Sequence, residues 1–142
     1  MNTIIRDVCA ADLSALTALY NQYILNTTIT FDLTPYTVQQ RTESWIPLYA
    51  LRQKAAFNTS VETSIYLSPE VCNQGIGTQL YSTLFEVLST EDVHRAYAGI
   101  TLPNESSIAL HRKFGFEQVG VFREVGRKFD RYWDVAWLEK AL

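Results

Sequence analysis

The residues best suited to chemistry are a carboxylate and a glycine-rich loop in the stretch VETSIYLSPEVCNQGIG. Glu62 lies near its start, and Gly75 and Gly77 lie at its end. Glycine lets the backbone approach a ligand closely. A helix that begins at such a loop presents unpaired N–H groups and a partial positive charge, which suit a phosphate. A phosphate-binding loop beside a carboxylate indicates a cofactor next to a proton acceptor.

The elements that position these residues follow from apolar patterns. Val61 to Leu67 is rich in strand-forming residues, so we expect a buried strand that ends at Ser68-Pro69. Apolar residues then recur at the spacing of one helix face, which predicts a helix that starts at the glycine loop. The positions are Ile76, Leu80, Leu84 and Val87/Leu88.

The first third of the chain predicts a strand and two helices. Thr3 to Arg6 is β-branched and is expected to be a strand, and Asp12 is expected to cap a helix. A second helix is expected over Thr37 to Trp45. Ile46 to Asn58 has a poor pattern, typical of a loop or a strand remnant.

The last third predicts strands around one helix. Ala96 to Leu102 is expected to be a strand, followed by a helix capped by Asn104 or Ser106 and ended by Gly115. Two closing strands are expected over Phe116 to Val125 and Phe129 to Leu138, with a turn around Gly126. A strand–helix–strand order requires a parallel pair, so we predict a mixed α/β or α+β domain.

Size and composition favour one globular domain over residues 1–142. The chain is 47% hydrophobic and 19% charged. Its net charge of −3 argues against nucleic acid or an anionic membrane as partner. The two cysteines, Cys9 and Cys72, form neither a disulfide framework nor a metal site. With no apolar run of membrane length and no signal-peptide layout, we expect a cytoplasmic protein without a metal.

Three segments together resemble the GNAT N-acetyltransferases, and within them the phosphinothricin acetyltransferase group. They are Gly75-Ile76-Gly77-Thr78, Leu102-Pro103-Asn104-Glu105-Ser106-Ser107 running to Phe114-Gly115-Phe116, and Gly126-Arg127-Lys128 running to Tyr132-Trp133-Asp134-Val135. Asn26-Thr27-Thr28 to Phe31 is also similar to that subgroup. The resemblance spans nearly the whole chain, and the second and third segments make it much more specific than a glycine loop alone.

The resemblance implies the GNAT fold and acetyl transfer from acetyl-CoA to a small amino-acid-like amine, of the phosphinothricin, methionine sulfoximine or methionine sulfone type. Glu62 falls at the catalytic base position, and His111 falls where many members place a tyrosine that reprotonates the leaving thiolate. Phe31 and Arg52 are expected to contact the substrate. The expected acetyl-CoA contacts are Ile65, Tyr66, Leu67, Asn73, Gln74, Gly75, Ile76, Gly77, Thr78, Asn104 and Ser107.

The residue types suit that reaction. An amine arrives protonated, and a carboxylate whose pKa is raised by burial takes that proton directly or through water. A backbone N–H near Leu67 is placed to stabilise charge on the thioester carbonyl. No metal is needed.

Two features depart from the family. Its glycine loop usually begins with Arg or Gln, and here that position is Cys72. The family also has a two-strand hairpin where this chain has only Ile46 to Asn58, short by about two ordinary strands. The strand bearing Glu62 would then have an exposed edge. We interpret the shortfall as missing residues rather than a hairpin lost in evolution; a genuine deletion would put activity in doubt.

Other interpretations stay open at this point. The alternative for Glu62 is a solvated strand carboxylate, for His111 a hydrogen-bonded helix residue, and for Phe31 a core residue. Arg52 reads equally as a surface residue. The chain is alternatively a non-catalytic acyl-CoA-binding module, or an acetyltransferase for a protein or peptide amine. The apolar content of Phe129 to Leu138 suggests a homodimer interface.

Overall fold

The computed structural model describes residues 3–45 and 55–142. It contains a four-stranded mixed sheet with the order β1-β2-β4-β3. The strands are β1 (Ser60–Glu62), β2 (Arg95–Thr101), β3 (Glu117–Lys128) and β4 (Arg131–Ala141). β1 and β2 are parallel, and β4 pairs antiparallel with both β2 and β3. The predicted mixed fold, with one parallel pair and a closing antiparallel ribbon, is confirmed.

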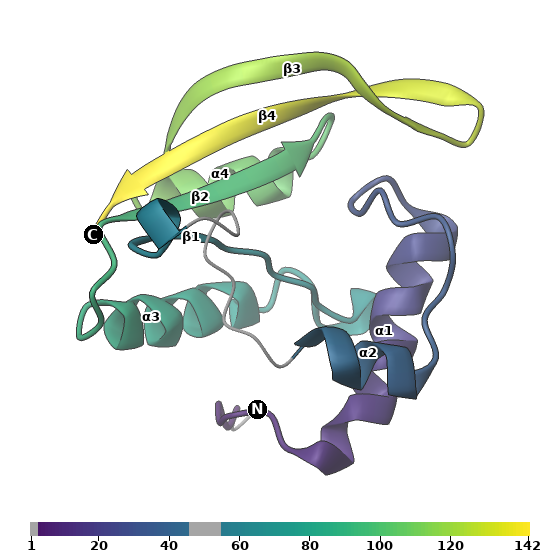
Figure 1. Ribbon diagram of the computed structural model, residues 1–142, viewed down its shortest axis with the longest axis horizontal. Coiled ribbons are helices and arrows are strands. Elements are labelled where there is room, and N and C mark those ends of the chain that lie inside the picture. Colours follow the sequence, from purple (N-terminus) through teal and green to yellow (C-terminus); the bar gives the residue numbers. More distant parts are fainter. Residues whose placement is uncertain (1–2, 46–54) are drawn as a thin grey trace.

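Four helices accompany the sheet. They are α1 (Leu13–Asn26), α2 (Val38–Trp45), α3 (Ile76–Leu88) and α4 (Glu105–Lys113). Short 3-10 turns lie at Ala10–Asp12, Ala55–Phe57 and Pro69–Val71. Figure 1 shows α1 and α2 packed together at one side, with α3 beneath the sheet and the long β3–β4 hairpin across the top. No helix in the described ranges is both long enough and apolar enough to span a bilayer.

The core lies between the sheet and the two helices α3 and α4. Ala96, Ala98 and Ile100 alternate along β2 on the buried face, as a half-buried strand requires. α3 contributes Leu84 and Phe85 to this core, and α4 contributes Ile108. The buried members are Val61, Leu88, Ala96, Ala98, Ile100, Phe116, Ala136 and Leu138. This packing fixes α3 and α4 against the parallel strands, where the candidate site is built.

Local signals in the sequence mark several boundaries correctly. The Asn104 Oδ1 atom accepts a hydrogen bond from the Ser107 N–H at 3.2 Å, so Asn104 caps α4. Gly115 has φ +81°, the left-handed conformation that ends a helix. Asp12 precedes α1, but its carboxylate accepts from Cys9 N–H and pairs with Arg6 instead of capping α1.

Three expectations about strands are wrong. Thr3 to Arg6 forms no strand, because no neighbouring strand among the described residues offers it a ladder. The strand predicted over Val61 to Leu67 ends at Glu62. The hairpin turn lies at Phe129-Asp130, both with positive φ, whereas Gly126 lies inside β3 at a shift in register.

The edge of β1 that does not face β2 is the place where the hairpin expected to be missing would pair. Within the described ranges, β1 pairs with β2 alone. The segment Ile46 to Asn58 lies mostly outside the described residues, which begin again at Ala55.

Candidate active site

A gap opens between two strands that begin as neighbours. Val61 pairs with Ala96 and Glu62 with Tyr97, and the last ladder bond runs from Thr63 N–H to the Tyr97 carbonyl at 2.8 Å. Beyond it, the N–H groups of residues 64–67 have no protein partner among the described residues. A cavity of about 40 Å³ lies in this gap. A strand that leaves its neighbour exposes a row of N–H donors, which is what a ligand lying along it requires.

The start of α3 exposes a second set of donors. Gly75 is the N-cap, with φ +81°, and the first helical bond runs from Gln79 N–H to the Gly75 carbonyl at 3.1 Å. The N–H groups of Ile76, Gly77 and Thr78 are therefore unpaired, as at any uncapped helix start. Together with the helix dipole they form a site for a phosphate.

The two glycines of the loop have different tasks. A Cβ at Gly75 would meet nothing within 4 Å, so this glycine serves the left-handed turn. A Cβ at Gly77 would lie 3.3 Å from Leu110 Cδ2 and 3.5 Å from Leu67 Cδ1. Gly77 therefore permits the close packing of α3 against the strand and α4.

A groove of about 320 Å³ joins the two sets of donors. It runs from the start of α3 along the strand extension to the start of α4. Ile29, Ile65, Asn104 and Ser107 line both the groove and the smaller cavity, so the two are continuous. The groove is lined by Tyr23, Ile29, Ile65, Leu67, Cys72, Asn73, Gly75, Gly77, Thr78, Asn104, Ser106, Ser107 and Leu110.

Glu62 lies at the point where the strands separate. Val61 and Thr63 are buried on the helix side, so Glu62 between them faces the other side of the sheet and is exposed. Desolvation by the surrounding protein nevertheless raises the pKa of its carboxyl above 4.5. Its neighbours Thr63 and Ser64 line the small cavity. Glu62 thus lies one position before the gap, on the face of the sheet opposite α3 and α4, and the pKa of its carboxyl is shifted in the direction that a base requires.

His111 lies on the inner wall of the same gap and is only 3% exposed. Its Nδ1 is 2.7 Å from the Ser107 carbonyl oxygen, which can only accept, so Nδ1–H donates there. Nε2 then accepts from the Tyr81 hydroxyl at 2.8 Å. Burial lowers the pKa of His111 and raises the pKa of Tyr81 to about 12, so both are neutral at pH 7. In this arrangement neither ring nitrogen is free toward the groove.

Most of the other residues predicted to contact acetyl-CoA lie along the groove, but the side chain of one of them is bonded elsewhere. The strand extension beyond β1 contains Ile65, Tyr66 and Leu67. The groove is lined by Asn73, Thr78, Asn104 and Ser107, and the last two also line the smaller cavity. The side chain of Gln74 is engaged elsewhere, donating to the Glu70 carbonyl at 2.9 Å, and Ile76 contributes its N–H from the first turn of α3.

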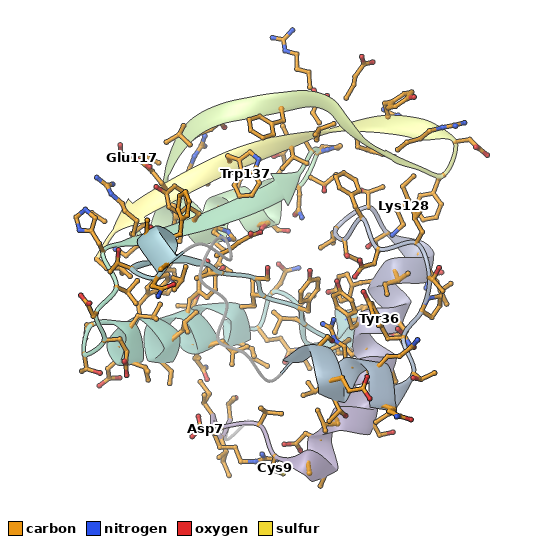
Figure 2. The ribbon with its side chains drawn as sticks, viewed as in Figure 1. Asp7, Cys9, Tyr36, Glu117, Lys128 and Trp137 are labelled. Atoms are coloured by element: carbon orange, nitrogen blue, oxygen red, sulfur yellow. The ribbon has the colours of Figure 1, made fainter. Side chains whose placement is uncertain are left out.

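Of the two residues expected to contact substrate, the structure describes Phe31, which does not line this groove. Phe31 packs against Gly126 of β3, where a Cβ would strike the Phe31 ring. The polar contact beside it joins the buried Lys128 Nζ to the Thr30 carbonyl at 2.8 Å, and Figure 2 shows Lys128 at the hairpin end beside the segment after α1. Arg52 lies outside the described residues.

Several residues of the site escaped the sequence interpretation. Tyr23 donates from its hydroxyl to the Leu67 carbonyl at 2.6 Å and so fixes the strand extension against α1. Tyr81 reaches His111 across 30 positions of the chain. Both tyrosines occupy apolar helix positions, and nothing in that pattern distinguishes a packed ring from one with a bonded hydroxyl. Among the described residues, no group of three His, Cys, Asp or Glu side chains could hold a metal ion.

The groove fits a coenzyme A thioester. The unpaired N–H groups of α3 suit its diphosphate, and the free N–H groups of residues 64–67 suit the amide-containing arm that follows. The acetyl-CoA that such a groove accepts supplies an activated acetyl group. The groove presents unpaired N–H donors to such a ligand, and Glu62 is the last residue of β1 before the strands separate.

Comparison with known proteins agrees with this fit. The model of the acetyltransferase (GNAT) domain matches residues 24–137. A phosphinothricin N-acetyltransferase of Streptomyces coelicolor is 45% identical over 92% of this chain and 91% of its own. An L-methionine sulfoximine/L-methionine sulfone acetyltransferase of Pseudomonas aeruginosa is 30% identical over 98% of this chain and 94% of its own.

A solved structure shares the architecture. The phosphinothricin acetyltransferase of Sinorhizobium meliloti, crystallised with acetyl-CoA, superposes with a TM-score of 0.92 at 31% identity and covers 96% of this chain and 86% of that one. The alignment with the Streptomyces coelicolor relative is 157 positions long. It includes 92% of the 142 residues of this chain, which is about 131 residues. About 26 positions of that alignment therefore have no counterpart in this chain, which is more than two ordinary strands of about 5–6 residues each.

The groove, the free donors and these similarities lead to one conclusion: this chain belongs to the GNAT acetyltransferase family, and it is an N-acetyltransferase that uses acetyl-CoA.

Proposed function

We propose that the acceptor is the amino group of a small amino-acid-like molecule, of the phosphinothricin, methionine sulfoximine or methionine sulfone type. The observation that carries this proposal is the opening between β2 and the extension of β1, which is continuous with the groove and begins directly after Glu62, the last residue of β1. The activities of the two relatives at 45% and 30% identity support the same substrate class.

A further cavity offers room for such an acceptor. It measures about 390 Å³ and shares Ile29 and Asn104 with the groove, and Thr101 with the gap between the strands. Phe129 and Trp133 of the hairpin form its aromatic wall. The cavity is open to solvent, so an acceptor can enter it, and its two aromatic side chains offer an apolar contact for a small molecule.

The proposed roles divide between the two faces of the gap. Glu62, with its raised pKa, takes a proton from the substrate ammonium, directly or through one water. The free N–H groups of residues 64–67 hold the cofactor arm and stabilise charge on the thioester carbonyl. Reprotonation of the departing thiolate by His111 stays a prediction, and it requires the ring to give up a bond to Ser107 or Tyr81.

The test is release of free thiol from acetyl-CoA with phosphinothricin, methionine sulfoximine, methionine sulfone, methionine and an N-terminal peptide amine as acceptors. The proposal expects turnover with at least one of the first three, at a higher kcat/KM than with methionine or the peptide. Turnover with the peptide alone would overturn the substrate class. Binding of CoA without any turnover would instead favour the non-catalytic alternative.

We propose in addition that the protein is a cytoplasmic homodimer. β3 is an edge strand with apolar side chains in water, among them Val119, Phe122 and Val125, each more than half exposed. Phe129 and Tyr132 extend this surface at the hairpin end, and an apolar edge of this size favours pairing with a second copy. Light scattering after gel filtration should give twice the 16.2 kDa chain mass, and Phe122→Lys should shift it to the monomer. A monomer at all concentrations would contradict the dimer.

A further inference from the structure

The phosphate end of the groove has no cation in its own wall. None of the described residues that line the groove is Lys or Arg. The loop before α3 carries Cys72, Asn73 and Gln74, and the Gln74 side chain is already bonded to the Glu70 carbonyl. The chain as a whole carries a net charge of −3. A polyanionic cofactor therefore meets only amide donors from this loop, in a protein whose overall field repels it.

One lysine reaches this end from another element. Lys113 is the last residue of α4, and its Nζ lies 3.4 Å from the Thr78 hydroxyl on the first turn of α3. Thr78 lines the groove and follows Ile76 and Gly77, whose N–H groups are unpaired. The ammonium group thus lies at the rim of the phosphate site, contributed by a helix 35 positions away in the chain.

The ammonium group also has the capacity to bind an anion. It has three N–H donors, and the long contact to Thr78 uses one of them. The side chain is exposed, and no carboxylate of the described residues forms an ion pair with it. An ammonium without an acidic partner, beside an anion site, is available to the ligand rather than to the fold.

We propose that Lys113 binds the diphosphate of acetyl-CoA and supplies, from α4, the positive charge that the loop before α3 lacks. The inference rests on the proposed placement of the cofactor in this groove. The contact with Thr78 holds the Lys113 Nζ atom beside the start of α3, where the unpaired N–H groups suit the diphosphate. We therefore assign the diphosphate as its partner, and not the 3′-phosphate at the far end of the nucleotide.

The experiment measures dissociation constants of CoA and of 3′-dephospho-CoA by calorimetry for the wild type, Lys113→Met, Lys113→Arg and Arg112→Met. Arg112 is the matched control, because it is the exposed cation next to Lys113 on the same turn. Lys113→Met should weaken both ligands by about tenfold, the usual size of a charge-assisted hydrogen bond at a partly exposed site. Lys113→Arg should restore most of the affinity, and Arg112→Met should stay within about twofold of the wild type.

Each of the other possible results contradicts one defined part of the proposal. Equal affinity of Lys113→Met and the wild type, or equal losses in both Met variants, would show that Lys113 makes no specific contact. A loss confined to CoA and absent with 3′-dephospho-CoA would place Lys113 at the 3′-phosphate and refute the assignment. If the wild type itself binds neither ligand, the cofactor groove fails, and with it the proposed function rather than this residue alone.

Discussion

Replacing Glu62 by Gln is expected to lower kcat for acetyl transfer by about 10² to 10⁴-fold, the range of a lost general base. The amide keeps the shape and the exposed position at the end of β1 but cannot take a proton from the ammonium. The dissociation constant of acetyl-CoA should stay unchanged, because Glu62 does not line the groove. Steady-state kinetics and calorimetry on the same preparation measure the two quantities.

The pH dependence of the reaction gives an independent check on Glu62. Desolvation raises the pKa of its carboxyl, and the base acts only when ionised. Activity of the wild type should therefore fall as the pH drops through that raised pKa, and the residual activity of Glu62→Gln should lack this limb. Glu91→Gln, at an exposed carboxylate after α3, is the control. A Glu62→Gln enzyme with more than a third of the wild-type kcat would rule out the proposed base.

Replacing His111 by Ala is expected to destabilise the fold strongly, whatever its effect on chemistry. The ring is buried, both its nitrogens are bonded, and it stacks edge-on against Tyr81 and Phe116. Its removal leaves a cavity and deprives the buried Tyr81 hydroxyl of its 2.8 Å partner. The two effects together should cost about 2–5 kcal/mol, which corresponds to a drop in Tm of about 6–20 °C for a chain of this size.

Thermal and urea unfolding at pH 7 measure this loss, with Tyr81→Phe as the companion. That variant keeps the ring and removes only the hydroxyl, so it should cost about 1–2 kcal/mol. Unfolding that is unchanged in His111→Ala would contradict the structural role. Rates should be measured well below the Tm of each variant, so that loss of chemistry is separated from loss of folded protein.

The stability of the wild type should also depend on pH through His111. Its pKa in the fold is lowered by burial, whereas the unfolded chain has a value near 6.5. Protons therefore bind the unfolded state preferentially below that value, and stability falls as the pH drops below about 6.5. A His111→Asn variant that folds should lose this part of the dependence.

The sequence was sufficient to predict those features of the fold that depend on residues close together in the chain. Gly75 at the start of α3, the Asn104 cap of α4 and the Gly115 stop each depend on a few adjacent residues. The strand expected over Ala96 to Leu102 is present as β2, Arg95–Thr101. These elements bring the glycine loop, Asn104 and Ser107 to one groove, and so most of the expected cofactor site was predictable.

What the sequence could not show depends on partners far along the chain. Ser64 to Leu67 has strand-forming residues, yet it leaves the ladder because β2 diverges from it. Thr3 to Arg6 lacks a neighbouring strand among the described residues, so its β-branched residues form none. The contacts of Tyr81 with His111 and of Lys113 with Thr78 join helices that share no pattern. Gly126 reads as a turn residue, but its task is to make room for the Phe31 ring.

A crystal structure of the protein with acetyl-CoA tests the central claim most directly. The account predicts that diphosphate oxygens accept hydrogen bonds from the N–H groups of Ile76, Gly77 and Thr78, at about 2.7–3.2 Å. It also predicts that the acetyl carbonyl lies in the gap between residues 64–67 and β2, on the side reached by Glu62. A diphosphate bound away from the start of α3, or an acetyl group closed off from Glu62 by the sheet, would contradict it.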